Sequence, residues 1–198
     1  MIPAPVTPEL FALPVLRLAH RLVGKVLVHV TPEGTVAGRI VETEAYRGPE
    51  DLAAHSRRGL RTARTEVMFG PAGHAYIYLL YGTSWAFNIV AGEIGQPHAV
   101  LVRAIEPIAG LDLMARWRNK PHDHRDLTNG PGKAAQALGL SRAQNGVALV
   151  GGALYVAEGT ASAIGRSHRI NIDYAGPWTD KPWRFYEKGN RYVSVKPR

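Results

Sequence analysis

Residues 74–91 read His-Ala-Tyr-Ile-Tyr-Leu-Leu-Tyr-Gly-Thr-Ser-Trp-Ala-Phe-Asn-Ile-Val-Ala. The runs 74–80 and 85–91 are rich in aromatic and β-branched residues, which favour extended strands. The connection 81–84, Tyr-Gly-Thr-Ser, is short and contains a glycine, as a tight turn requires. This stretch therefore predicts a β-hairpin and makes an antiparallel sheet the centre of the fold.

The segments outward from this hairpin complete an α+β pattern. Further strands are predicted at residues 25–31, 38–46, 99–105, 154–157, 169–172, 183–186 and 191–195. Helices are predicted at residues 14–23, 107–118 and 131–138, and a polar loop at residues 56–66. The sequence shows neither an internal repeat nor a low-complexity linker. We therefore predict an α+β fold, a single domain over residues 1–198 with an antiparallel curved β-sheet and flanking helices.

Composition narrows the function classes. The chain has 24 Lys plus Arg against 16 Asp plus Glu, and a net charge of +8 favours a polyanionic partner such as nucleic acid. Cysteine is absent, which excludes disulfides, thiolate metal ligands and cysteine nucleophiles. No apolar run reaches the length of a membrane span, and residues 1–23 lack the apolar core of a signal peptide. We expect a soluble, cytoplasmic monomer that does not contact a membrane.

Charged residues interrupt two of the predicted strands. Side chains alternate between the faces of a strand, so Glu42, Glu44 and Tyr46 share one face of strand 38–46. A solvated face is the simplest interpretation of this pattern. Arg103 stands inside the apolar strand 99–105 and needs a counter-charge if it is buried. An ion pair with Glu42 or Glu44 is one interpretation, and a catalytic carboxylate beside an arginine is the other.

Aromatic and amide side chains gather in and near the hairpin. Tyr76 and Tyr78 share one strand face, and Tyr81 ends the run. Core packing explains the tyrosines structurally, and a hydrogen bond to a nearby turn explains Asn88. The functional interpretation is a stacking platform for a base, with His55 at the start of an arginine-rich loop. Together with a carboxylate and Arg103, these side chains could bind a flat aromatic group and activate a water molecule beside it.

Several long blocks of the sequence carry a family resemblance. They include residues 38–46 (Gly-Arg-Ile-Val-Glu-Thr-Glu-Ala-Tyr), 53–56 (Ala-Ala-His-Ser), 68–71 (Met-Phe-Gly-Pro), 76–82 (Tyr-Ile-Tyr-Leu-Leu-Tyr-Gly), 101–104 (Leu-Val-Arg-Ala), 129–133 (Asn-Gly-Pro-Gly-Lys) and 181–186 (Lys-Pro-Trp-Arg-Phe-Tyr). In content and order they resemble the alkyladenine DNA glycosylase family, the 3-methyladenine DNA glycosylases of the mammalian type. The match covers nearly the whole chain. It resembles a compact bacterial-type member without the long N-terminal extension of the vertebrate proteins.

The resemblance implies base excision repair. Such an enzyme flips alkylated or deaminated purines out of duplex DNA and hydrolyses the N-glycosidic bond, which leaves an abasic site. Glu44 would be the general base that activates water, and Arg103 would hold the water and the carboxylate. Tyr46 and His55 would stack on one face of the flipped base, and Tyr78 on the other.

The resemblance also implies contacts with the substrate and the DNA. Asn88 would line the pocket and disfavour guanine. The implied DNA contacts are Tyr81 as a wedge in the base stack, Arg57, Arg64, Met68, and Gly132 with Lys133 at the start of the predicted helix 131–138. A backbone carbonyl near Ile172 would help hold the water. Asn171 and Asp173 depart from the Gly-rich pocket wall of vertebrate relatives, which bears on the breadth of the pocket. The expected site holds neither a metal ion nor an organic cofactor.

The nucleophile and two rival functions complete the sequence predictions. None of the six lysines lies in the blocks that carry Glu44, Tyr46, His55, Tyr78, Asn88 and Arg103. Activated water rather than an amine is therefore expected, as in a monofunctional glycosylase. One rival is a metal-dependent nuclease that uses Glu42, Glu44, Glu50 and Asp51. The other is an RNA-binding module without catalysis, which would use the same rings and cations. In a bacterium the protein would associate with the nucleoid.

Overall fold

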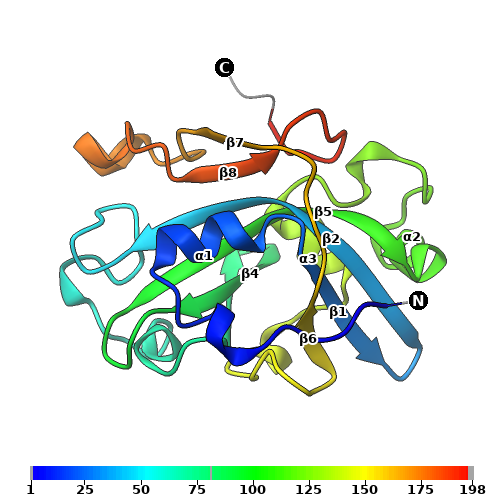
Figure 1. Cartoon of the computed structure of the whole chain (residues 1–198), viewed down its shortest axis with the longest axis horizontal. Helices are drawn as coiled ribbons and strands as arrows, with labels where there is room; N and C mark the ends of the chain where they lie inside the picture. The colour runs from blue at the N-terminus through cyan, green and yellow to red at the C-terminus, as the bar shows by residue number, and fades with distance from the viewer. Residues whose placement is uncertain (1, 81, 196–198) are drawn as a thin grey trace.

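The computed structural model describes residues 2–80 and 82–195, and its strands form one antiparallel sheet (Figure 1). The strands are β1 (Val26–Thr31), β2 (Gly34–Arg47), β3 (Ala75–Leu80), β4 (Ser84–Ala91), β5 (His98–Ala109), β6 (Leu154–Ala157), β7 (Ile164–Ser167) and β8 (Arg184–Glu187). The helices are α1 (Val15–Leu22), α2 (Leu111–Arg118) and α3 (Pro131–Ala137). The described chain confirms the predicted α+β class and the β3–β4 hairpin.

Short 3-10 turns link these elements. They are η1 (Pro8–Leu10), η2 (Arg57–Gly59), η3 (Glu66–Phe69), η4 (Arg125–Leu127), η5 (Arg142–Gln144) and η6 (Asp173–Trp178). Two of them, η2 and η3, fall in or next to the polar stretch 56–66 that the sequence predicts as a loop. The described residues contain no helix long and apolar enough to cross a membrane.

Strand β2 is the centre of the sheet. The strand order is β3-β4-β5-β2-β1-β6, and β5 pairs with β2 along almost its whole length. On its other side, β2 pairs with β1 over residues 34–39 and with β8 over residues 42–44. The β2–β5 ladder shifts register between Ile40 and Thr43, where Arg103 has no directly opposed residue. Both edges of β2 are therefore covered in the part that carries the glutamates.

One face of the sheet forms the main core. Ala45, Val100, Ile89 and Ala75 oppose one another across β2, β5, β4 and β3, and all four are buried in the main apolar cluster. Helix α1 packs on the sheet with its buried stripe of Val15, Leu18, Ala19 and Leu22, the spacing expected of an amphipathic helix. The same period of two places the next residues of each strand on the opposite face, away from this core.

Several predicted elements differ from the structure. Residues 107–109 continue strand β5, and α2 begins only at Leu111. Gly110 makes the break with φ of +70°, where a Cβ atom would lie 2.5 Å from the carbonyl oxygen of Thr35. Residues 169–172 and 191–195 are irregular rather than strands, and β7 was not predicted. Strand β8 begins one residue later than expected.

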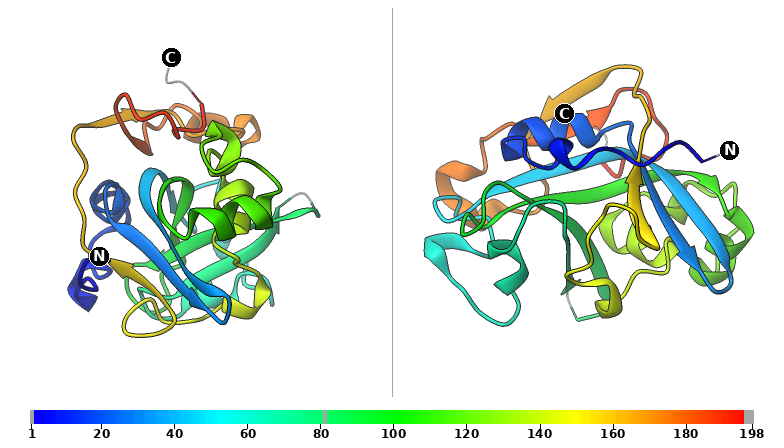
Figure 2. Two further views of the ribbon diagram at one scale, coloured as in Figure 1. Left: turned by 90° about the vertical axis from the view of Figure 1, so that its right-hand side faces the viewer. Right: turned by 60° about the horizontal axis from the view of Figure 1, so that its bottom comes forward.

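The loops gather at one end of the molecule. The segment that follows β2 and the η6 segment lie at the left end in Figure 1 and in the right-hand view of Figure 2, whereas α2 and α3 lie toward the other end. Gly132 lets α3 approach the hairpin, because a Cβ atom there would lie 2.8 Å from the Cβ of Ser84. The hairpin therefore stands between the loops and the helices.

Candidate active site

The polar face of the sheet is built by strand register. Glu44, Leu101, Asn88 and Tyr76 oppose one another in turn across β2, β5, β4 and β3. Directly opposed residues on antiparallel strands point to the same face, so these four side chains form one row. Residues two positions along a strand share its face, which adds Tyr46, Arg103 and Tyr78. Alternation along four strands thus brings the predicted residues together.

A cleft of about 710 Å³ opens over this row. Its walls come from the sheet, from the loop that follows β2, from the hairpin tip, from the start of α3 and from the segment before η6. The lining includes Tyr46, Ala53, His55, Arg64, Met68, Tyr76, Tyr78, Asn88, Leu101, Arg103, Lys133, Ile170, Ile172 and Tyr174. The structure therefore brings most of the predicted site residues into one cavity large enough for a purine.

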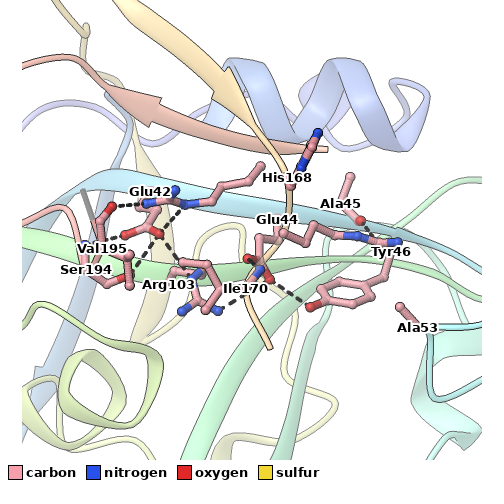
Figure 3. A network of polar contacts seen from close by, with 12 residues as sticks. Glu42, Glu44, Ala45, Tyr46, Ala53, Arg103, His168, Ile170, Ser194 and Val195 are labelled. Carbon is pink, nitrogen blue, oxygen red and sulfur yellow. Dashed lines mark hydrogen bonds and ion pairs between the residues drawn. The ribbon is translucent and has the colours of Figure 1, made fainter. Parts of the chain in front are cut away.

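Glu44 lies behind the floor of this cleft. Its side chain is fully buried, which contradicts the solvated strand face that was the simplest interpretation. The Tyr46 hydroxyl donates to Oε2 at 2.7 Å, and the Ile170 N–H donates to Oε1 at 2.8 Å. Arg103 Nη1 approaches Oε2 only to 3.4 Å (Figure 3). A carboxylate has about four acceptor sites, so two remain for water or a reacting proton.

Arg103 forms the ion pairs that its place in an apolar strand demanded. Its Nε donates to Glu42 at 3.1 Å, and Figure 3 shows it between Glu42 and Glu44. Burial pulls the pKa of Arg103 down, but the charges of Glu44 and Glu42 outweigh it and leave the pKa above its ordinary value. Arg103 is therefore a permanent cation whose guanidinium lies 3.4 Å from the Glu44 carboxylate.

Glu42 has a different set of partners from Glu44. Its Oε1 accepts from Arg184 Nε at 2.7 Å and from the Ser194 hydroxyl at 2.9 Å, besides Arg103. Its Oε2 accepts from the Ser194 N–H at 2.6 Å. The Ser194 N–H thus bonds a buried carboxylate where a strand would bond a neighbouring backbone carbonyl. Glu42 is thus saturated by protein donors and is not free to react.

Tyr46 is held by an arginine that the sequence did not single out. The Arg169 guanidinium lies over the Tyr46 ring, 4.7 Å from its centroid, and forms a double hydrogen bond with Asp51 at 2.5 and 2.9 Å. Both side chains of this ion pair are fully buried. Burial raises the pKa of Tyr46 well above its usual range, and the adjacent charge of Glu44 adds to the rise. The hydroxyl therefore keeps its proton and remains a donor to Glu44.

His55 belongs to an aromatic cluster with the hairpin tyrosines. Its ring meets Tyr78 edge to face with centroids 4.4 Å apart, and Nδ1 lies 2.9 Å from the Tyr76 hydroxyl. Burial, followed by the charges of Arg64 and Arg57, lowers the pKa of His55 to about 4, so the imidazole is neutral at pH 7. His55 therefore lies beside Tyr78, and no base-sized gap separates these two rings, unlike the predicted arrangement on opposite faces of a base.

The remaining pocket residues are built into the sheet. Asn88 is buried and donates through Nδ2 to the Tyr76 carbonyl at 3.0 Å, so its amide orientation is fixed. Met68 is only 1% exposed and packs with Tyr76. It lines the cleft, and its expected contact with DNA stays a prediction. Burial raises the pKa of Tyr76 to about 12 and raises that of Tyr78 as well, so both rings stay neutral.

The expected DNA contacts fall into three groups. Arg57 is exposed in η2, and within residues 2–80 and 82–195 it forms no ion pair with a carboxylate. Gly132 and Lys133 begin α3, but the Lys133 ammonium already bonds Asn129 at 2.9 Å and Asp126 at 3.2 Å. A phosphate would therefore compete with these oxygens. Tyr81, the predicted wedge, lies outside the described residues.

The carboxylates of the nuclease hypothesis do not converge. Each of them pairs with an arginine: Glu42 and Glu44 with Arg103, Glu50 with Arg47, and Asp51 with Arg169. Among the described residues, no group of three or more His, Asp or Glu side chains is arranged to hold a metal ion. The geometry thus favours a carboxylate held by proton donors over a metal site.

The sequence predictions gave no role in this site to Arg169, Arg184 or the backbone N–H of Ile170, and they named Asp51 only as a carboxylate of the nuclease hypothesis. The Asp51–Arg169 pair spans 118 positions, and neither residue carries a local pattern that points to the other. The available signal was indirect: Arg169 begins the predicted strand 169–172, and a buried arginine has to find a counter-charge. Asn171 has φ of +57°, which an asparagine tolerates better than most residues.

Comparison with known proteins gives a family match over most of the chain. The family model of methylpurine-DNA glycosylase (MPG) matches residues 9–191. These residues include every residue that builds the cleft floor and both loops above it.

Individual relatives match over nearly their whole length. A protein of Desulfitobacterium hafniense with the name "Putative 3-methyladenine DNA glycosylase" is 48% identical over 188 residues, 90% of this chain and 93% of that protein. A protein of the same name from Methanocella arvoryzae is 47% identical over 195 residues, 97% of both chains. A third, from Clostridium acetobutylicum, is 44% identical over 196 residues, 94% of this chain and 96% of the relative.

Proposed function

Because the chain belongs to the methylpurine-DNA glycosylase family, we propose that it removes alkylated purines from DNA by hydrolysing the bond between the base and deoxyribose. One observation carries the proposal. The fully buried carboxylate of Glu44 is held by Tyr46, Ile170 and Arg103 behind a cleft whose walls are aromatic. A reactive carboxylate beside a purine-sized aromatic cleft is what base excision chemistry requires.

The base has to leave the duplex before it reaches this cleft. Extrusion costs a few kcal/mol, and less where damage weakens pairing. An N3- or N7-alkylated purine carries a positive charge, so stacking on a tyrosine ring adds about 0.5–2 kcal/mol that an undamaged purine lacks. Tyr46 and Tyr78 are among the rings that line the cleft, and burial raises the pKa of each phenol, so both rings are neutral. Deaminated purines are neutral and would depend on their weakened pairing alone.

Bond cleavage follows from the charge around Glu44. As the C1′–N bond breaks, its electron pair passes to the base and the sugar becomes cationic. Glu44 stabilises that cation and takes a proton from the attacking water, whose oxygen bonds to C1′. Arg103 places a positive charge beside Glu44, and the two donors to Glu44 fix the carboxylate in place. The products are a free base and an abasic site.

The same geometry supports a water nucleophile over an amine. No lysine is among the sheet residues of the cleft, and Lys133, which lines it from α3, bonds Asp126 and Asn129. We therefore propose a monofunctional enzyme of one domain, residues 1–198, that acts as a monomer on DNA in the cytoplasm.

A base-release assay tests the proposal. Duplexes with a single 7-methylguanine or hypoxanthine are incubated with the protein in the presence of a chelator, and released base is measured by chromatography. We expect release of 7-methylguanine that resists the chelator. Binding without release would favour the RNA-binding hypothesis, and strand cleavage that the chelator stops would favour the nuclease. Hypoxanthine release decides whether deaminated purines are substrates.

A further inference from the structure

Arg64 stands in the cleft against the ring that is expected to stack on the lesion. Its Cζ atom lies 4.8 Å from the centroid of the Tyr78 ring, and its Nη2 lies 3.2 Å from His55 Nε2. A guanidinium only donates hydrogen bonds, so His55 Nε2 accepts and Nδ1 carries the proton toward Tyr76. Arg64 is also one of the residues that line the cleft.

The other contacts of the Tyr78 ring leave little room beside Arg64. Tyr76 packs on Tyr78 with centroids 5.5 Å apart, and His55 meets it at 4.4 Å. The guanidinium is planar and cationic, as an alkylated purine is, and it interacts with the same ring by the same cation–π force. Two cations of this kind repel each other and do not share one ring face.

The charge of Arg64 has no carboxylate to balance it in the described part of the chain. Arg61, in the same loop, shows the contrast. It stacks on Phe69 at 4.9 Å but is paired with both carboxylate oxygens of Glu66, at 2.9 and 2.6 Å. Arg64 is exposed and is held only by neutral rings, so a phosphate offers it a stronger partner than it has in the free protein.

We infer that Arg64 occupies, in the DNA-free protein, the stacking place that a cationic base takes on Tyr78, and that it leaves this place for a DNA phosphate. This inference rests on the proposed function and adds a determinant of specificity to it. Entry of a cationic base becomes conditional on a phosphate contact, so a free alkylated base or nucleoside is a poor ligand. When the C1′–N bond breaks, the electron pair neutralises the base, which then loses its cation–π attraction to Tyr78. Arg64 is again the cation that binds this ring.

The first test compares Arg64→Gln with the wild-type protein in the absence of DNA. The probe is N-methylquinolinium, a permanently charged bicyclic ring of about purine size, and binding is measured by calorimetric or NMR titration. We expect Arg64→Gln to bind the probe about tenfold more tightly, the scale of one cation–π contact. Arg61→Gln is the matched control and should bind the probe as the wild type does. Equal affinity of Arg64→Gln and the wild type would overturn the inference.

The second test supplies phosphates without a base. The probe is titrated into each protein bound to a duplex with a tetrahydrofuran abasic site. Because the phosphate should draw Arg64 away, the wild type should now match Arg64→Gln, and the tenfold difference should vanish. A difference that persists on the abasic duplex would contradict the exchange.

Base release from a 7-methylguanine duplex, measured with the same wild-type preparation, separates this inference from the proposed function. Release together with equal probe affinities rejects the role of Arg64 and leaves the glycosylase assignment standing. A tenfold difference without release supports the exchange in the cleft and rejects the glycosylase assignment. Arg64 is exposed, so thermal unfolding of Arg64→Gln should match that of the wild type and confirm a folded protein.

Discussion

Glu42 and Glu44 offer a controlled comparison between a structural and a catalytic carboxylate. They lie two residues apart on one face of β2, both are fully buried, and both pair with Arg103. The substitutions Glu42→Gln and Glu44→Gln make the same chemical change at matched positions. We predict opposite outcomes, because the two side chains differ in how many protein donors they satisfy.

Glu44→Gln should abolish base release with little loss of stability. An amide cannot accept the proton of water, and general-base help is worth about 10²–10⁴-fold. Loss of the negative charge beside a cationic sugar adds to this, so we expect at least a thousandfold slower release, on the order of the upper half of that range. The amide keeps acceptors and donors for Ile170 and Tyr46, and Arg103 keeps Glu42. The cost to folding should be about 1–2 kcal/mol.

Glu42→Gln should unfold easily but retain its chemistry. It removes the one carboxylate that Arg184 contacts among the described residues, and it weakens bonds from Arg103 and Ser194. Breaking a buried pair costs about 3–5 kcal/mol. At about 2–4 °C per kcal/mol for a domain of this size, Tm should fall by about 10 °C, against about 4 °C for Glu44→Gln.

The assay is single-turnover release of 7-methylguanine at a temperature where both variants are folded, paired with thermal melts by circular dichroism. Affinity for the lesion duplex should change little in Glu44→Gln. Release by Glu44→Gln within tenfold of the wild type would refute the general-base assignment. Slower base release by Glu42→Gln than by Glu44→Gln would indicate that Glu42 is the catalytic carboxylate and Glu44 the structural one.

Three further predictions concern pH, salt and the nucleophile. The pKa of His55 is about 4 in the folded protein and near 6.5 in the unfolded chain, so its contribution to stability is complete above pH 6.5 and is lost as pH falls toward 4. Urea unfolding should show a loss of about 2 kcal/mol between pH 7 and pH 5 that is absent in His55→Gln, and identical pH dependence in the two proteins would contradict the low pKa. Arg57→Gln should lower the log–log salt slope of DNA binding by about 0.9, and an unchanged slope would remove Arg57 from the phosphate contacts. Borohydride should trap no protein–DNA adduct on a lesion duplex and strands should stay intact before alkali, whereas a trapped adduct would show an amine nucleophile.

The sheet part of the site could be predicted because it depends on alternation within single strands. Placing Glu42, Glu44 and Tyr46 on one face of β2 requires only the period of two. The ion pair of Arg103 with the glutamates was one of the open interpretations, since a buried guanidinium needs a counter-charge. What alternation could not supply is the order of strands in the sheet, which decides that β5 lies next to β2.

The loop part of the site could not be predicted, because its contacts are distant and its backbone is irregular. The run Arg-Ile-Asn-Ile-Asp at 169–173 alternates like a strand, and the prediction of a strand there was wrong. Asn171 turns the chain with a positive φ, and the Ile170 N–H bonds Glu44 instead of a strand partner. The local hydrophobic pattern cannot show whether a backbone N–H bonds a side-chain carboxylate or a neighbouring strand. The helix start predicted at Pro107 was also wrong, because β5 continues to Ala109 and the chain breaks at Gly110.

The division between sheet and loops has a consequence for substrate range. Glu44 stands on β2 opposite Leu101 of β5 and Arg184 of β8, so backbone ladders on both sides fix its position. Arg103 lies on β5 at the register shift and is held by its ion pairs with Glu42 and Glu44. His55, Arg64 and Asn171 come from loops, whose backbone is held by fewer partners. Sites on regular elements hold chemical groups more accurately than sites on loops. A change in the loops can therefore alter which bases enter the cleft, whereas a change at Glu44 or Arg103 acts on every lesion alike.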